Sequence, residues 1–114
     1  SNQWPDVIQG YAAGLPGTLL MAVVAVAVGP LAEELYFRGV MLPWLAHRVG
    51  PGAALWISSA AFAAMHLYYG VGVVVALWYG LVLAWARLRT GGLFAPVALH
   101  VTMNALAFGA SLAA

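Results

Sequence analysis

The sequence contains no cysteine and no lysine, and only 6% of its 114 residues are charged. Without cysteine, the chain can form neither a disulfide nor a thiolate metal site. A soluble domain usually carries about a quarter charged residues, so this chain cannot cover a water-facing surface. The net charge of +1 gives no basic patch, which argues against nucleic acid as a partner. We therefore expect the chain to lie in a lipid bilayer.

What the sequence does contain is a series of long apolar runs with short breaks. About 20 apolar residues in a helix cross a bilayer core, so the runs predict helical segments over 7–32, 31–47, 51–69, 72–87 and 93–112. Breaks at Gly29-Pro30, 48–52, 68–72 and 87–92 separate them. The predicted fold is an all-α, polytopic transmembrane bundle of about five helical segments.

These segments form a single membrane-embedded domain over residues 1–114. The chain begins with Ser1 and not with methionine, so we also consider it a fragment of a longer polytopic chain. Antiparallel packing of 51–69 and 72–87 would place Arg48 beside Arg87 and Arg89, a side that the positive-inside rule makes cytoplasmic. The use of arginine without lysine suggests a GC-rich bacterial source. We expect an integral protein of the bacterial cell (inner) membrane.

Four polar residues lie inside these apolar segments: Glu33, His66, His100 and Asn104. Ionisable groups at membrane depth are costly and face the bundle interior, so a functional role is their default interpretation. The rise per helical residue places all four at overlapping depth if neighbouring helices are antiparallel. A carboxylate, two imidazoles and an amide are also the groups that a water-activating hydrolase needs.

The densest cluster is Glu33-Glu34, followed by Arg38. Glu34 and Arg38 are four residues apart on one helical face, where an acid and a base pair favourably. Glu33 points about 100° away from Glu34 and stays without a counter-charge in an apolar setting, which suits a general base. The alternative is a salt-bridged helix start at the membrane interface after Pro30.

The two histidine motifs come later in the chain. His66 follows Phe62 by one turn among small residues that permit close helix approach, and it could accept a proton, orient a water or bind a metal. His100 and Asn104 share a helical face, and both can donate hydrogen bonds to an oxyanion. The alternative for each is a polar residue that holds helices together by hydrogen bonding across them.

Taken in order, these motifs resemble the signature of the CAAX prenyl protease and bacteriocin-processing family (CPBP, also called Abi) of intramembrane endopeptidases. The matching residues are Glu33-Glu34 with Arg38, Phe62 with His66, and His100 with Asn104, over about residues 30–110. The resemblance implies peptide-bond hydrolysis inside the membrane, with Glu33 and His66 activating water. It also implies that His100 and Asn104 stabilise the oxyanion, while Glu34, Arg38 and Phe62 support the site.

Two mechanisms stay open for such a site. We favour a metal-free mechanism that requires no cofactor, because the helix that carries Glu33 lacks a His-Glu-x-x-His arrangement. In the alternative, Glu33, His66 and His100 supply the three protein ligands of an open catalytic zinc site.

The expected function is that of an endopeptidase acting on a membrane-embedded or membrane-delivered peptide or protein. A prenylated CAAX tail is the family's eukaryotic substrate, whereas a leader peptide or a membrane protein suits a bacterial source better. One alternative is a non-catalytic immunity or adaptor protein that retains the family's core. Another is a proton- or ion-conducting subunit, because chains of Glu and His also serve as relays.

Overall fold

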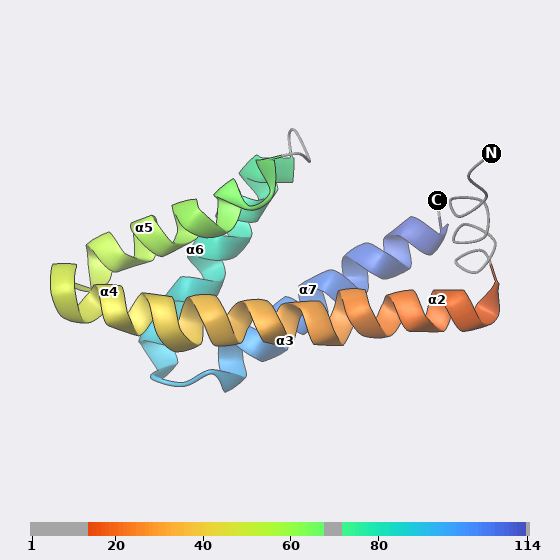
Figure 1. The fold of residues 1–114 in the computed structure, drawn as a ribbon, viewed down its shortest axis with the longest axis horizontal. Coiled ribbons are helices and arrows are strands. Elements are labelled where there is room, and N and C mark those ends of the chain that lie inside the picture. The colour runs from red at the N-terminus through yellow and green to blue at the C-terminus, as the bar shows by residue number, and fades with distance from the viewer. Residues whose placement is uncertain (1–13, 68–71, 114) are drawn as a thin grey trace, which may run out of the picture.

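The computed structural model describes residues 14–67 and 72–113, and this part of the chain is all helical, with no strand (Figure 1). A continuous helix over Leu15–Val49 is followed by α5 (Pro51–Ala64), α6 (Gly72–Thr90) and α7 (Phe94–Ala113). The predicted all-α membrane bundle is confirmed. The described residues form four helices where five segments were predicted, because the described part of 7–32 continues into 31–47 as one helix.

The first helix runs through the break that we predicted at Gly29-Pro30. Its parts are α2 (Leu15–Ala22), the π-helical segment η1 (Val23–Val28), α3 (Gly29–Glu34), the π-helical segment η2 (Leu35–Met41) and α4 (Leu42–Val49). A proline removes one backbone hydrogen bond and crowds the preceding turn. Here a wider π-helical turn precedes each internal proline, Pro30 and Pro43, and this local adjustment lets the helix continue.

Three helices are long and apolar enough to cross a membrane: Leu15–Val49, α6 and α7. The 35 residues of the first helix extend over about 52 Å, which exceeds a bilayer core of about 30 Å. Its α4 end carries Trp44 and Arg48, whose guanidinium lies 4.4 Å from the indole ring centroid. A cation over an interfacial tryptophan suits an end that emerges from the hydrocarbon.

The connections follow the predicted glycine and proline signals. Gly50 has a φ of 88° and ends the first helix, and Pro51 begins α5. Gly91, with a φ of 75°, follows the end of α6, and Pro96 lies in the first turn of α7. Of the segment predicted over 51–69, Pro51–Ala64 is α-helical, and residues 68 and 69 lie outside the described residues. Most of the turn predicted over 68–72 lies outside the described residues.

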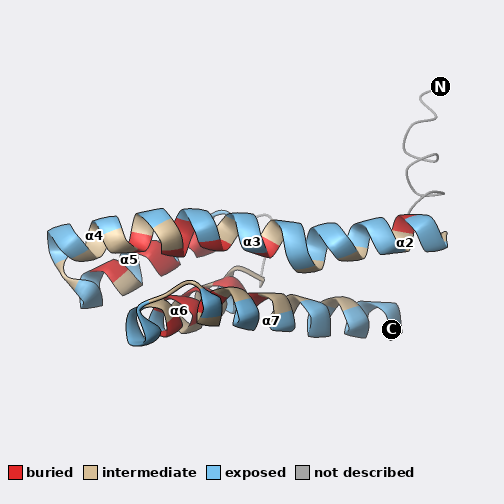
Figure 2. Cartoon of the chain, turned by 90° about the horizontal axis from the view of Figure 1, so that it is seen from below, coloured by how far each residue is buried: buried red, intermediate tan, exposed pale blue. Residues whose placement is uncertain are grey.

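Burial is concentrated where the first helix crosses α5, α6 and α7 (Figure 2). Phe37, Phe62, Ala63 and Ala76 form one core cluster there. The side chains that point outward are large and apolar along every helix, including Leu19, Val40, Trp78 and Leu106. An apolar exterior around a small polar interior is the arrangement that a lipid environment requires.

Candidate functional site

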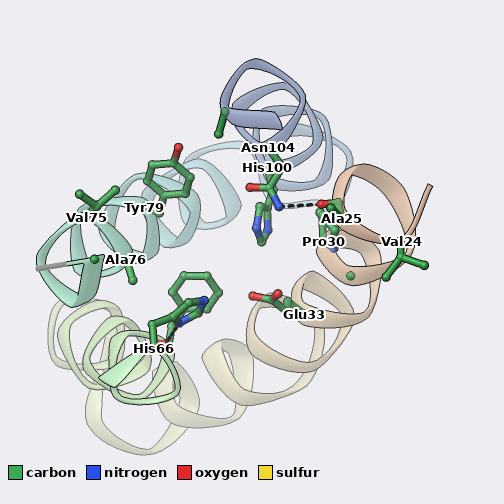
Figure 3. A pocket seen from close by; sticks show the side chains of 14 residues that line it. Val24, Ala25, Pro30, Glu33, His66, Val75, Ala76, Tyr79, His100 and Asn104 are labelled. Carbon is green, nitrogen blue, oxygen red and sulfur yellow. Dashed lines mark hydrogen bonds between the residues drawn. The ribbon is translucent and has the colours of Figure 1, made fainter. Parts of the chain in front are cut away.

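The four polar residues singled out in the sequence line one cavity of about 630 Å³ (Figure 3). Glu33 faces it from the first helix, His66 from the end of α5, and His100 and Asn104 from α7. The remaining lining is mostly apolar and comes from η1, α3, α5, α6 and α7. The structure therefore brings together groups that are up to 71 residues apart, from 33 to 104, in the sequence.

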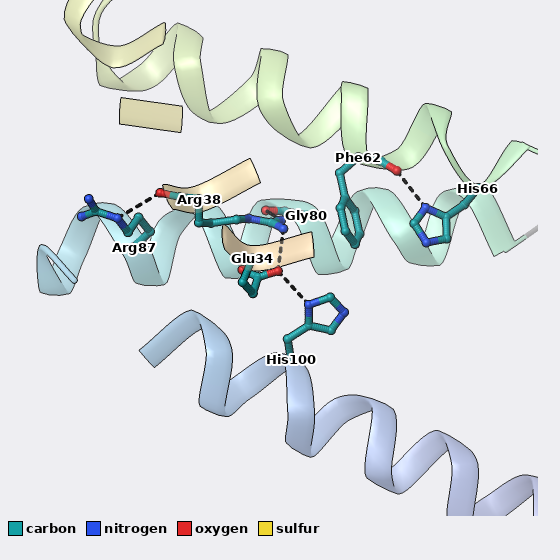
Figure 4. Close-up of polar contacts among 7 residues, drawn as sticks. All are labelled: Glu34, Arg38, Phe62, His66, Gly80, Arg87 and His100. Carbon is teal, nitrogen blue, oxygen red and sulfur yellow. Dashed lines mark hydrogen bonds and ion pairs between the residues drawn. The ribbon is translucent and has the colours of Figure 1, made fainter. Parts of the chain in front are cut away.

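A buried polar network stands behind this cavity (Figure 4). Arg38 donates from Nη1 to Oε2 of Glu34 at 2.8 Å, so the predicted pair forms. His100 Nδ1 lies 2.7 Å from the same Glu34 oxygen, and Arg38 Nη2 donates to the carbonyl of Gly80 at 3.0 Å. Glu34 is 0% and Arg38 1% exposed, so their charges are compensated inside the protein and not by water. The network ties α6, the first helix and α7 together.

The Glu34 carboxylate also determines how His100 can act. An ionised carboxylate only accepts hydrogen bonds, so Nδ1 of His100 carries the proton and donates to it. The other ring nitrogen, Nε2, is then an acceptor in the neutral ring and a donor in the imidazolium. His100 can therefore donate to a group in the cavity only when its ring carries a hydrogen on both nitrogens.

Phe62 lies at the centre of the site. Its ring centroid is 4.8 Å from that of His66 and 5.9 Å from that of His100, and the Arg38 guanidinium carbon lies 4.6 Å from it. It also packs edge-on against Phe37 at 5.3 Å. The side chain is 2% exposed, so it holds both imidazoles and the guanidinium by packing and by cation–π attraction.

His66 lies just beyond the end of α5 and not within a longer helix. Its Nδ1 lies 2.8 Å from the carbonyl oxygen of Phe62, one of the carbonyls that the helix end leaves without a backbone partner. A carbonyl only accepts, so Nδ1 donates to it. The neutral ring consequently carries its lone pair on Nε2, the tautomer that is able to take up a proton.

Glu33 differs from Glu34 in that it makes no ion pair with another described residue. Its Oε2 atom is buried and has no hydrogen-bond partner among the described residues. The residue is half-buried, and its carboxylate points into the cavity toward the two imidazoles (Figure 3). A buried unpaired carboxylate oxygen is costly, and such atoms concentrate at functional sites.

Asn104 spans the cavity wall between α7 and the first helix. Its Nδ2 donates to the carbonyl oxygen of Ala25 in η1 at 2.9 Å (Figure 3). This bond is of the helix-joining kind that the sequence left open as an alternative for Asn104. An amide nitrogen carries two hydrogens, so one remains for another acceptor.

The three ligands considered for zinc do not meet the requirement of a metal site. Within residues 14–67 and 72–113, no group of three or more His, Asp or Glu side chains is close enough to hold one metal ion. Glu33, His66 and His100 line the same cavity, but from different walls. The arrangement of these side chains therefore does not fit the zinc alternative.

Several contributors to the site were not singled out in the sequence. Tyr79 lines the cavity from α6. Gly80 contributes its carbonyl to Arg38, and Ala25 contributes its carbonyl to Asn104. Every residue has a backbone carbonyl, so the residue types at positions 80 and 25 do not indicate that these carbonyls accept a side chain. For Ala25 the indirect sign is Pro30, because a proline lacks the N–H that would bond to a carbonyl of the preceding turn.

The chain is similar to known proteins over most of its length. It matches the family described as type II CAAX prenyl endopeptidase, Rce1-like, over residues 15–106. It is 35% identical over 98 residues to an uncharacterized 24.3 kDa protein of Escherichia coli, a match that covers 81% of this chain and 44% of that protein. The chain thus spans less than half the length of this relative, and no solved structure matches it. With the family's motifs gathered around one cavity, the chain belongs to the Rce1-like family of CAAX prenyl endopeptidases.

Proposed function

We propose that this protein is an intramembrane endopeptidase that hydrolyses a peptide bond with a water molecule activated by Glu33 and His66. The observation that carries the proposal is the Glu33 carboxylate, which has a buried, unpartnered oxygen in a cavity that two imidazoles also line. A general base needs this combination of an available oxygen and a partly desolvated position.

In the proposed reaction, Glu33 removes a proton from water while His66 orients it, and the water oxygen attacks the scissile carbonyl carbon. The carbonyl oxygen becomes an oxyanion, and two groups that line the cavity would donate to it: Nε2 of His100, when both ring nitrogens carry a hydrogen, and the second Nδ2 hydrogen of Asn104. The proton held by Glu33 then passes to the leaving amine as the C–N bond breaks. No metal takes part in these steps.

The supporting residues act through His100. Glu34 accepts a hydrogen bond from Nδ1 of the ring, and Arg38 pairs with the same Glu34 oxygen and holds it in place. Phe62 fixes the plane of both imidazoles. This arrangement resembles a catalytic triad, in which a buried carboxylate orients a histidine without reacting itself.

The proposed substrate is a peptide segment of a membrane-embedded or membrane-delivered protein, because the cavity is largely apolar and opens between membrane-spanning helices. We propose the bacterial cell membrane as the location, which a relative from Escherichia coli supports.

A non-catalytic immunity or adaptor role is the second candidate. The observation in its favour is that His100 and Asn104 already donate to protein acceptors, as residues with a purely structural role would. Alanine at Glu33 would leave a binding or protective phenotype intact if this role were correct.

A cleavage assay on the purified full chain in detergent micelles tests the proposal. We would use two fluorescence-quenched reporters: a farnesylated peptide with a CAAX-type C terminus and a non-lipidated single-span peptide. We expect the wild type to cleave at least one, and Glu33→Ala and His66→Ala to lose at least about a hundredfold in kcat. Full activity in both variants would eliminate the assigned chemistry.

A further inference from the structure

Two prolines lie in the interior of the first helix. Pro16, Pro51 and Pro96 occupy the first turns of their helices, where a missing N–H leaves no gap in the hydrogen bonding. Pro30 and Pro43 instead follow the π-helical segments η1 and η2. Each of these two prolines therefore removes a donor that a helix interior needs.

The π-helical register identifies which carbonyl loses its partner. In this register an N–H bonds to the carbonyl five residues earlier, and the N–H of Gly29 bonds to Val24 while that of Leu42 bonds to Phe37. The next donors in the two series would be residues 30 and 43, both prolines. The carbonyls left without a backbone donor are consequently those five residues earlier, at Ala25 and Arg38.

These same two carbonyls accept side chains from other helices. Asn104 of α7 donates to the carbonyl of Ala25 at 2.9 Å, and Nε of Arg87 in α6 donates to the carbonyl of Arg38 at 3.1 Å. An orphaned carbonyl within a membrane-spanning helix needs a donor from elsewhere, and here a neighbouring helix supplies it. At both prolines, the carbonyl that loses its backbone donor is the one that accepts the side chain, which explains why these two bonds form at Ala25 and Arg38.

We propose that Pro30 is a positioning residue for Asn104, an inference that rests on the proposed function. By leaving the Ala25 carbonyl without a backbone donor, Pro30 creates the acceptor that orients the carboxamide. Because a carbonyl only accepts, the amide must turn its Nδ2 toward the first helix. One Nδ2 hydrogen is thereby fixed, and the other is held at the cavity wall beside His100 (Figure 3).

The second proline provides a matched control. Pro43 leaves the Arg38 carbonyl to Arg87 in the same way, but Arg87 does not line the cavity. If such bonds only joined helices, Pro30→Ala and Pro43→Ala would have similar consequences. If Pro30 positions Asn104, only Pro30→Ala affects the reaction.

The experiment compares Pro30→Ala, Pro43→Ala, Asn104→Ala and the Pro30→Ala/Asn104→Ala double variant of the full chain. We would measure kcat and KM on the reporter that the wild type cleaves, and the thermal unfolding midpoint of each variant. Alanine at position 30 supplies an N–H to the Ala25 carbonyl and releases Asn104. We expect kcat to fall at least about tenfold, toward the ~10²- to 10³-fold cost of losing one oxyanion donor.

The remaining readouts distinguish positioning from damage. In Pro30→Ala, KM should change by less than about twofold, whereas Pro43→Ala should keep kcat within about twofold of the wild type. Adding Asn104→Ala to Pro30→Ala should cause no further loss of kcat, as expected for coupled residues. Wild-type kcat in Pro30→Ala, or losses that multiply in the double variant, would overturn the proposal.

Unfolding tests the same bond independently of catalysis. Asn104→Ala should lower the unfolding midpoint of the wild type but not that of Pro30→Ala, which no longer holds the carboxamide. If the wild type cleaves neither reporter, the proposed function fails. The positioning proposal is then decided by unfolding, and equal effects of Asn104→Ala in both backgrounds would overturn it.

Discussion

His100 and Arg38 donate to the same oxygen of Glu34, Oε2, at 2.7 and 2.8 Å. The second glutamate of the Glu33-Glu34 pair therefore does more than neutralise an arginine on its own helix. It connects the carbonyl of Gly80 on α6, through Arg38, to the imidazole on α7. One buried carboxylate thus links three of the helices that line the site: the first helix, α6 and α7.

Removing Arg38 should destabilise the protein strongly, because Arg38→Met removes the guanidinium that pairs with the fully buried Glu34 carboxylate. We expect the free energy of unfolding to fall by about 3–5 kcal/mol, the usual cost of breaking a buried pair. The measurement is reversible unfolding in mixed detergent micelles. Arg48→Met is the control: Arg48 is exposed and contacts the Trp44 ring, so its loss should cost about 1 kcal/mol or less. Equal losses in the two variants would contradict the network.

Substituting Gly80 should separate α5 from α6. A Cβ at position 80 would lie 3.1 Å from the Cα of Ser59, a backbone contact that cannot give way without moving a helix. We expect Gly80→Ala to lower the free energy of unfolding by about 1–3 kcal/mol through overpacking, and to weaken the Arg38 bond to the position-80 carbonyl.

Gly109 is the matched glycine, inside α7 with nothing within 4 Å of an added Cβ. Gly109→Ala should raise the free energy of unfolding by about 0.5–1 kcal/mol, because alanine is the better helix former. A destabilised Gly109→Ala beside an unaffected Gly80→Ala would refute this account of the packing.

Sequence reasoning went furthest where the physics is local. The apolar runs predicted helices, and the spacing of Glu34 and Arg38 predicted their ion pair. The depth argument also predicted that Glu33 would share a cavity with the histidines. Each of these depends on helical periodicity or on the cost of polar groups in lipid.

What the sequence could not provide depends on partners distant in the chain. We treated Gly29-Pro30 as a break because glycine and proline commonly end a helix. A donor 79 residues away from Ala25, on Asn104, satisfies the carbonyl that Pro30 orphans, and the first helix continues. The pairing of His100 with Glu34, 66 residues away, was missed because both residues already had assigned roles.

Metal removal should leave the activity unchanged. No three acidic or histidine side chains in the described ranges converge on one point, and the reaction proposed here assigns no step to zinc. We expect the purified protein to contain far less than one equivalent of zinc by elemental analysis. Incubation with 1,10-phenanthroline should leave kcat within about twofold, since nothing in the proposed steps would be removed. Stoichiometric zinc together with inhibition that added zinc reverses would establish the other mechanism.

The central claim, that Glu33 activates the attacking water, is tested most directly by kcat for Glu33→Gln beside Ser59→Ala. Both substitutions change a residue with a buried oxygen that lacks a partner among the described residues, but only Glu33 lines the cavity. Glutamine retains the shape of the side chain and cannot take up the proton. The account predicts a loss of about 10²- to 10⁴-fold in Glu33→Gln and wild-type cleavage by Ser59→Ala. Undiminished cleavage by Glu33→Gln would contradict it.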